Sequence, residues 1–228
     1  MTTRSTNVLR CLLLALSLLL PCAWAPAADA SLEELMSYDG LRKVGVKGID
    51  LAYARPGARL STYHRVMIDP VEVAFSKSWN PKRTGTMLPI PESDRERIRT
   101  GIARIVREEF ERELQSNSGY QVATAAGPDV LRVKANIANL VVNAPDTSAN
   151  SARSYVISAG EMTLVAELYD SESGQVEARL IDRSVARSNS RLQLTGAMQN
   201  ADEARTIAAA WARTLRTAMD RAHGVGGK

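Results

Sequence analysis

The stretch EMTLVAELYDSESGQVEARLIDRSVAR, residues 161–187, decides the fold, because its residue pattern predicts a β-hairpin. Aliphatic side chains recur at every second position in both arms, which is typical of strands with one buried face. Between the arms, Glu172-Ser173-Gly174 suits a three-residue loop, in which a type I turn is followed by glycine at positive φ. The aliphatic positions are Met162, Leu164, Ala166 and Leu168 in the first arm and Val176, Ala178 and Leu180 in the second.

The loop also predicts the register of the hairpin. If Ser171 lies opposite Gln175, the aliphatic positions of both arms share one face of the sheet. A slip by one residue would place Leu168 opposite Glu177 and mix the two faces. The expected pairs are Leu168 with Ala178 and Ala166 with Leu180 on one face, and Glu167 with Arg179 and Val165 with Ile181 on the other.

Asp182 disagrees with this pattern, because it falls on the aliphatic face opposite Leu164. One interpretation is that the strand has passed the edge of whatever covers it, or that it carries a bulge, since aspartate is rarely fully buried. The other is a buried carboxylate with a hydrogen-bond or arginine partner, in a structural or functional role.

Residues 1–30 predict a secretory signal peptide. Arg4 and Arg10 precede an apolar run at 11–20, which is shorter than the roughly 20 residues of a membrane span. Ala28-Asp29-Ala30 is a small-x-small cleavage site, so we expect cleavage after Ala30 and a mature chain that starts at Ser31. No transmembrane helix is expected in the mature chain.

Cys22 offers an alternative to soluble export. A lipid-attachment cysteine usually follows a leucine and two small residues, whereas Cys22 follows the rigid Pro21. We therefore expect a periplasmic protein, with lipid anchoring to the outer membrane through Cys22, or a short uncleaved anchor, as alternatives. Since Cys11 and Cys22 both lie in the signal segment, the mature chain can form neither a disulfide framework nor a thiolate zinc site.

The charge balance argues against nucleic acid as a partner. The chain has 29 basic and 25 acidic residues and a net charge of +4. Between residues 95 and 113 the two signs alternate, so no run of like charge marks a nucleic-acid surface.

Two further strands and two helices are expected along the chain. A strand at 63–76 breaks at Asp69-Pro70, because proline cannot donate to a β-ladder. A strand at 131–142 changes parity near Ala138-Asn139, which predicts a bulge. The helices are recognised by apolar stripes, which comprise Ile98, Ile102, Ile105, Val106, Phe110 and Leu114 in the first, and Ala204, Ile207, Ala208, Trp211, Leu215, Ala218 and Ala222 in the second.

The ends of the helices carry their own signals. The first helix spans 93–115, with a capping box of Ser93 and Glu96 at its start and Gly119 as its stop. A second capping arrangement begins at Asn200. Residues 31–62 are expected to form an extended arm with a short edge strand at Leu51-Ala52-Tyr53.

These elements predict the fold class. Residues 63–223 are expected to form a single α+β domain with the order β-α-β-β-β-α, and residues 224–228 a disordered tail. Because the strands alternate, one face of the sheet should be covered. We therefore expect a two-layer sandwich, in which two helices pack on one face of a mainly antiparallel sheet.

Several motifs resemble domain-of-unknown-function family 3313, an uncharacterised bacterial family of exported lipoproteins. They are YDGL at 38–41, YARPG at 53–57, Tyr63 with VMIDPV at 66–71, and the stretch 160–174 leading to Asp182. The sequence departs from the family at Pro21-Cys22, where the lipid anchor would lie. The resemblance implies no established activity, ligand or catalytic residue.

The residues themselves indicate little catalytic chemistry. No metalloprotease motif, phosphate loop or nucleophile elbow occurs, so we expect no enzyme, no metal site and no cofactor. His64 starts a strand, and His223 is explained by its place at a helix C-terminus. Asp69, Asp170 and Asp182 could meet in the fold, although turns explain the first two more simply.

The sequence leaves three hypotheses on function, of which we favour the first and keep the other two as alternatives. The first is a non-catalytic envelope protein that binds another envelope component through its sheet face or the loop at 143–160, and a flat, partly apolar sheet would favour it. The second is a carrier of a small ligand or lipid in a groove between sheet and helices, which a deep apolar pocket would favour. The third is a hydrolase built on carboxylates, which acids converging on His64 would favour. The oligomeric state is not predicted.

Overall fold

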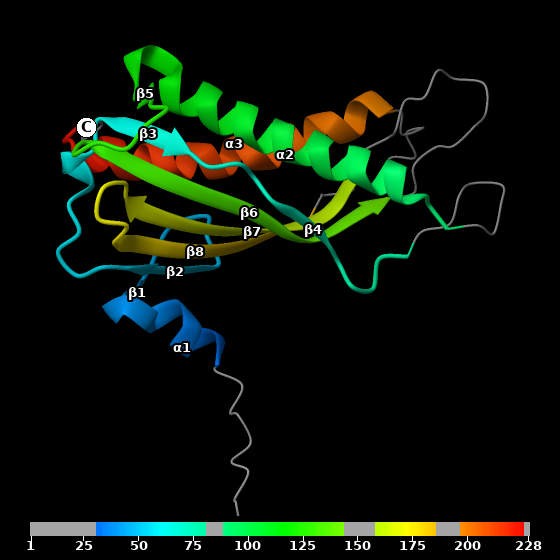
Figure 1. Cartoon of the computed structure of the whole chain (residues 1–228), viewed down its shortest axis with the longest axis horizontal. Coiled ribbons are helices and arrows are strands. Elements are labelled where there is room, and N and C mark those ends of the chain that lie inside the picture. The colour runs from blue at the N-terminus through cyan, green and yellow to red at the C-terminus, as the bar shows by residue number, and fades with distance from the viewer. Residues whose placement is uncertain (1–30, 81–88, 144–157, 186–196, 226–228) are drawn as a thin grey trace, which may run out of the picture.

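The computed structural model describes residues 31–80, 89–143, 158–185 and 197–225 (Figure 1). Within them one eight-stranded sheet has the strand order β1-β2-β8-β7-β6-β3-β5, and β4 also pairs with β6. The strands are β1 (Arg42–Val44), β2 (Leu51–Ala54), β3 (Arg65–Ile68), β4 (Val73–Phe75), β5 (Gln121–Val122), β6 (Val130–Asn143), β7 (Ser158–Asp170) and β8 (Val176–Val185). The helices are α1 (Leu32–Ser37), α2 (Glu92–Gln115) and α3 (Ala197–Ala222), with short 3-10 turns η1 (Tyr38–Gly40), η2 (Leu60–Thr62) and η3 (Ser116–Ser118).

The helices cover the two faces of the sheet unequally. Helices α2 and α3 lie side by side over one face, and α1 lies on the other (Figure 1). The main core lies beneath α2 and α3. A small second cluster holds α1, where Met36 packs with Leu41, Tyr53 and Val176.

The predicted hairpin is confirmed along its arms as β7 and β8. Leu168 pairs with Ala178, Ala166 with Leu180, Glu167 with Arg179 and Val165 with Ile181. The expected pairing at the turn is wrong, because a bulge sets Tyr169 opposite Val176. The turn closes one residue earlier than expected, since the Asp170 carboxylate accepts hydrogen bonds from the Ser173 N–H at 2.8 Å and hydroxyl at 2.7 Å. Gly174 has the expected positive φ, at 69°.

Most of the sheet is antiparallel, as expected, but β3, β4 and β5 introduce parallel pairs that were not expected. The strand expected at 63–76 splits into β3 and β4, and both run parallel to β6. The chain passes from β4 through α2 before it reaches β6, and a helical crossover of this kind joins parallel strands. The sheet is therefore mixed, although the α+β class holds.

Strand β6 carries the predicted bulge, and β2 does not lie at the sheet edge. The bulge in β6 is confirmed, since its pairing with β7 shifts after Ala138 and Asn139 has a φ of 52°. The strand expected at the sheet edge near Leu51 is β2, but it lies inside the sheet because β1 pairs with its outer side.

The helix starts differ from the predicted caps, whereas the apolar stripes largely hold. Helix α2 begins at Glu92 after Pro91, so Ser93 is not its N-cap, and α3 begins at Ala197, which places Asn200 inside the helix. All six stripe residues of α2 are buried. In α3 the last expected position, Ala222, is exposed, and Met219 is buried instead.

The signal segment lies outside the described residues, with the Ala30 cleavage site and Cys22. The same holds for residues 144–157, most of the loop expected at 143–160. Ser31, the first described residue, forms a capping box with Glu34 at the start of α1. No helix in the described part of the chain combines the length and the apolar character needed to cross a bilayer.

Gly119 ends the α2 region for a reason other than the one predicted. Its φ is −71°, and the left-handed residues are Asn117 and Ser118. A Cβ on Gly119 would lie 2.2 Å from the carbonyl oxygen of Leu114 and 2.4 Å from Nη1 of Arg216. That same Nη1 donates to the carbonyl oxygens of residues 113, 114 and 116 at 3.0, 3.2 and 2.8 Å, so α3 caps the end of α2.

We predict that Gly119→Ala lowers the free energy of unfolding by about 1–3 kcal/mol, as overpacked substitutions do, because the new methyl group meets backbone and the guanidinium clamp. Gly45→Ala is the matched control. No atom lies within 4 Å of a Cβ placed there, so its effect should stay within about 0.5 kcal/mol. Urea unfolding of both variants measures the difference, and equal stability would contradict the close approach at Gly119.

Candidate functional site

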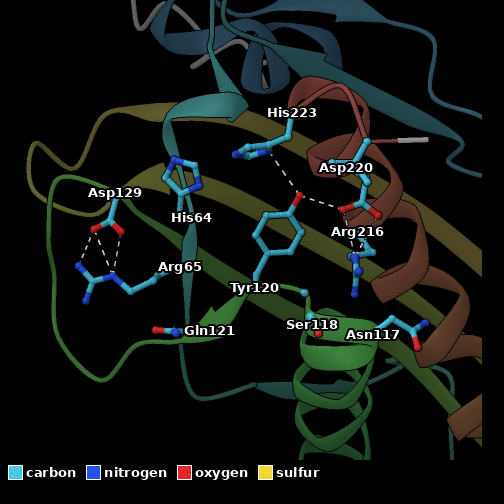
Figure 2. Close-up of a pocket in the computed structure, with 12 residues that line it drawn as sticks. His64, Arg65, Asn117, Ser118, Tyr120, Gln121, Asp129, Arg216, Asp220 and His223 are labelled. Atoms are coloured by element: carbon cyan, nitrogen blue, oxygen red, sulfur yellow. Dashed lines mark hydrogen bonds and ion pairs between the residues drawn. The ribbon is translucent and has the colours of Figure 1, made fainter. Parts of the chain in front are cut away.

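Two hollows bring chemically distinct residues together. The first, which we call the apolar groove, has a volume of about 140 Å³ and lies between α3 and strands β2, β7 and β8. The second, the polar cleft, is a wider hollow of about 670 Å³ between η3, β5 and the end of α3 (Figure 2). The groove is lined by Val44, Val46, Ile49, Ala52, Tyr53, Ala54, Leu60, Phe110, Val133, Leu164, Ala166, Leu168, Ala178, Leu180, Trp211, Thr214, Leu215 and Ala218.

Small residues create the apolar groove. Alanine occurs at four lining positions in the strands that face α3, namely Ala52, Ala54, Ala166 and Ala178. Ala54 and Ala178 are direct neighbours across β2 and β8, so that part of the sheet presents no side chain long enough to reach the helix. As a result the apolar face of the sheet is filled beneath α2 and α3 but left hollow toward β2.

One polar contact closes one end of the groove and explains Asp182. The indole Nε1 of Trp211 donates to Oδ2 of Asp182 at 2.6 Å, and the Asp50 backbone N–H donates to Oδ1 at 3.1 Å. Asp182 is half-buried, and the carboxylate of Asp50 in turn accepts from the backbone N–H of Arg183 at 2.9 Å. The predicted hydrogen-bond partner of Asp182 is therefore confirmed, as an indole and a backbone amide, whereas the predicted burial is wrong because the side chain is only half-buried.

The polar cleft is built around Tyr120 (Figure 2). Its hydroxyl donates to Oδ1 of Asp220 at 2.9 Å, and Nε of Arg216 donates to both oxygens of the same carboxylate at 3.1 and 3.0 Å. Burial, with the hydrogen bond to Asp220, raises the pKa of Tyr120 to about 12. The tyrosine therefore stays neutral at physiological pH and acts as a hydrogen-bond donor.

The two histidines meet in this cleft, which the sequence did not indicate. Their ring centroids lie 5.0 Å apart in an edge-on arrangement. Nδ1 of His223 lies 2.9 Å from the carbonyl oxygen of Met219, and since a carbonyl only accepts, Nδ1 carries the proton. Nε2 of His223 is buried without a hydrogen-bond partner among the described residues, and in Figure 2 the ring points toward His64.

Arginines pair with both carboxylates of the polar cleft, Asp129 and Asp220. Asp129 accepts from Nε of Arg65 at 3.1 and 3.0 Å, and this hydrogen bonding holds the pKa of Asp129 below its usual value. Asp220 is bound by Arg216 in the same manner. A general acid or base works best with a pKa near neutrality, and the pKa of Asp129 is shifted away from it. The cleft therefore resembles a hydrogen-bonded junction between α2, β3 and α3 more than a hydrolytic site.

Each of the three carboxylates considered from the sequence has its own partner. Asp69 pairs with Arg132, and Asp170 holds the hairpin turn and accepts from the hydroxyl of Tyr63 at 3.2 Å. Asp182 binds Trp211. Within residues 31–80, 89–143, 158–185 and 197–225, no three histidine, cysteine or acidic side chains gather as metal ligands.

The sheet face opposite α2 and α3 carries ion pairs. Arg132 pairs with Asp69, Arg179 with Glu167 and Arg183 with Glu161. The hydrogen bonds from Arg183 hold the pKa of Glu161 below its usual value. This face therefore combines ion pairs with the apolar cluster that α1 covers, and it is not the flat, partly apolar surface that would favour a partner docked on the sheet.

Comparison with known proteins supplies the following matches. The family model described as "Protein of unknown function (DUF3313)" matches residues 32–215. No curated protein matches this chain. Similar solved structures include the PelC dodecamer from Paraburkholderia phytofirmans, with 9% identity, a TM-score of 0.36, and coverage of 77% of this chain and 98% of that one. Protein XCC0632 from Xanthomonas campestris, from family DUF330, has 12% identity, a TM-score of 0.38, and coverage of 74% and 92%. At these TM-scores neither likeness bears on function.

We predict that Asp182→Ala lowers the free energy of unfolding by about 1–3 kcal/mol, because it leaves the Trp211 and Asp50 N–H groups without an acceptor. Asp202→Ala, which removes an exposed carboxylate from α3, is the control and should change stability by less than about 1 kcal/mol. Thermal or urea unfolding measures both. Equal losses would show that the Asp182 contact contributes no more than an ordinary surface charge.

Proposed function

Because the chain belongs to the DUF3313 family of proteins of unknown function, we propose a function from its own geometry. The protein is a non-catalytic binding protein of the bacterial cell envelope, and it holds an apolar ligand in the apolar groove. The observation that carries this proposal is the lining of the groove, which is aliphatic and aromatic apart from Thr214 and the polar atoms of Tyr53 and Trp211.

The size of the groove sets the class of ligand. An apolar cavity of about 150 Å³ in another protein holds one benzene ring, and the groove has about 140 Å³. It therefore accommodates roughly six carbon atoms, such as the end of an alkyl chain or one aromatic ring. Most drug-sized ligands need about 300–1,000 Å³, so a large rigid cofactor does not suit it.

The affinity of such a contact can be bounded. Transfer of six carbons out of water contributes at most about 5 kcal/mol, at roughly 0.8 kcal/mol for each methylene. This corresponds to a Kd no tighter than a few tenths of a millimolar. An apolar tail alone would therefore bind weakly and exchange rapidly, which is the behaviour of a carrier.

The assignment to the envelope rests on the signal-peptide pattern at 1–30, with its expected cleavage after Ala30. The start of α1 is compatible with that cleavage. The Ser31 nitrogen lies 2.8 Å from Oε2 of Glu34, so a new amino terminus at Ser31 would keep this contact as an ion pair. Lipid anchoring through Cys22 would place the same domain at the outer membrane and leave the groove unchanged.

The two other hypotheses have less support. Docking of a partner on the sheet is disfavoured by the ion pairs on its open face. Hydrolysis is disfavoured because both carboxylates of the polar cleft, Asp129 and Asp220, are bound by arginines. Each would place the functional surface away from the apolar groove.

We predict that 1-hexanol, an uncharged probe whose six carbons match the volume of the groove, binds the full chain and that Ala218→Phe abolishes this binding. The added ring would occupy the space that the ligand needs, because Ala218 lines the groove. A ligand-observed NMR titration, which is suited to weak binding, measures the affinity of both proteins.

Ala210→Phe provides the matched control, since Ala210 is exposed on the same helix and lies outside the groove lining. It should bind the probe like the unmodified chain. If the probe does not bind, or if both variants bind it equally, the groove is not a ligand site.

A further inference from the structure

We propose that the ligand is an amphiphile with an anionic head group, whose tail enters the apolar groove and whose head meets Arg42, Arg59 and Arg221. This inference rests on the proposed function and adds the chemistry of the ligand. The three arginines come from β1, the segment before η2 and the end of α3, and each is next to a residue that lines one end of the groove, by register or by sequence.

The two ends of the groove differ in charge. At one end Asp182 and Asp50 are satisfied by the Trp211 indole and by backbone N–H groups. The other end is marked by Ala54, Leu60 and Ala218, where η2 packs against α3. Since the carboxylates lie at the first end, an anionic head group would be repelled there and accepted at the second.

Arg42 is placed at the second end by the register of the sheet. It pairs with Ala54 across β1 and β2, and cross-strand partners share one face of a sheet. Ala54 lines the groove, so Arg42 lies on the groove side at its margin. Lys43, the next residue, pairs with Tyr53 and belongs to the opposite face, where the Tyr53 hydroxyl contacts Glu33 of α1.

Arg59 and Arg221 adjoin lining residues in the same region. Arg59 directly precedes the lining residue Leu60. Arg221 follows the lining residue Ala218 by three positions, so Arg221 and Ala218 are neighbours on the surface of α3. Arg42, Arg59 and Arg221 are all exposed. Among the described residues, none of the three forms a hydrogen bond or an ion pair through its side chain.

The acids nearby in sequence are already bound. Asp220, beside Arg221, is held by Arg216 and Tyr120. Asp39, which precedes β1, pairs with Arg179. Arg55, which follows β2, donates to the carbonyl oxygens of Val176 and Asp39. Three guanidinium groups are thus left to meet an anion from outside the described chain.

Arginine suits this role because its planar group forms paired hydrogen bonds with a carboxylate or a phosphate. The head group is therefore a fatty-acid carboxylate or a lipid phosphate. Its contacts would add to the weak affinity of the tail, and they would weaken at high ionic strength because the arginines are exposed.

The test measures binding of decanoate, decyl phosphate, 1-decanol and inorganic phosphate to the full chain by calorimetry, each below the concentration at which it self-associates. We expect both anionic amphiphiles to bind more tightly than 1-decanol, and inorganic phosphate to bind much more weakly than decyl phosphate. Arg42→Glu should weaken decanoate binding by about fivefold or more. Arg59→Glu should act in the same direction, and 0.5 M salt should reduce the difference between decanoate and 1-decanol.

Lys43→Glu is the matched control, because it makes the same change of charge one residue away on the other face. It should alter decanoate affinity by less than about twofold, and 1-decanol binding should be unchanged in all three variants.

The outcomes separate the two proposals. If 1-decanol binds as tightly as decanoate, or if Arg42→Glu and Lys43→Glu act equally, the anionic head group is wrong while the groove stands. If inorganic phosphate binds as tightly as decyl phosphate, the arginines form an anion site independent of the groove, which overturns the inference. If no alkyl ligand binds, the proposed function fails as well.

Discussion

The burial of one face of β7 beneath α2 and α3 is the constraint on which the rest of the structure depends. Leu164, Ala166 and Leu168 are 3–5% exposed, and β7 lies between β6 and β8 in the sheet. Because side chains alternate along a strand, fixing this face fixes the register of both neighbours. This register places Asp182 within hydrogen-bond distance of Trp211 and Ala178 opposite Ala54. The burial of one face of β7 therefore also defines the groove.

The sequence predicted what depends on neighbouring residues. The hairpin register followed from one glycine and an alternating pattern, and the stripe of α2 followed from helical spacing. The parallel pairs of β3 and β4 with β6 were missed. They depend on the direction in which the chain re-enters the sheet after α2, which the local sequence pattern does not indicate. The failed cap at Ser93 has a local cause, since Pro91 already has the extended backbone of an N-cap and accepts from the N–H groups of residues 94 and 95.

The candidate site was only partly predictable. A groove between sheet and helices was among the expected possibilities, and the alanines at 52, 54, 166 and 178 were its signal. These alanines form a hollow only because β2 pairs with β8, which brings Ala54 and Ala178 together although they are far apart in the chain. The contact between His64 and His223 had no sequence signal, since it depends on where the end of α3 meets β3.

The groove is a cavity that the protein retains although an unfilled cavity lowers its free energy of unfolding. An unfilled cavity destabilises a protein by about 24 cal/mol for each Å³, so the groove, of about 140 Å³, costs at most about 3 kcal/mol. Larger side chains at Ala54 or Ala178 could fill it from two adjacent strands without any change of topology. Arg42, Arg59 and Arg221, which pair with no acid in the described part of the chain, add like-charge repulsion that acids on β1 or α3 could relieve. Nearby substitutions could thus fill the groove and neutralise the arginines, yet the chain has neither change. Both features suit a ligand that supplies the hydrocarbon and the negative charge.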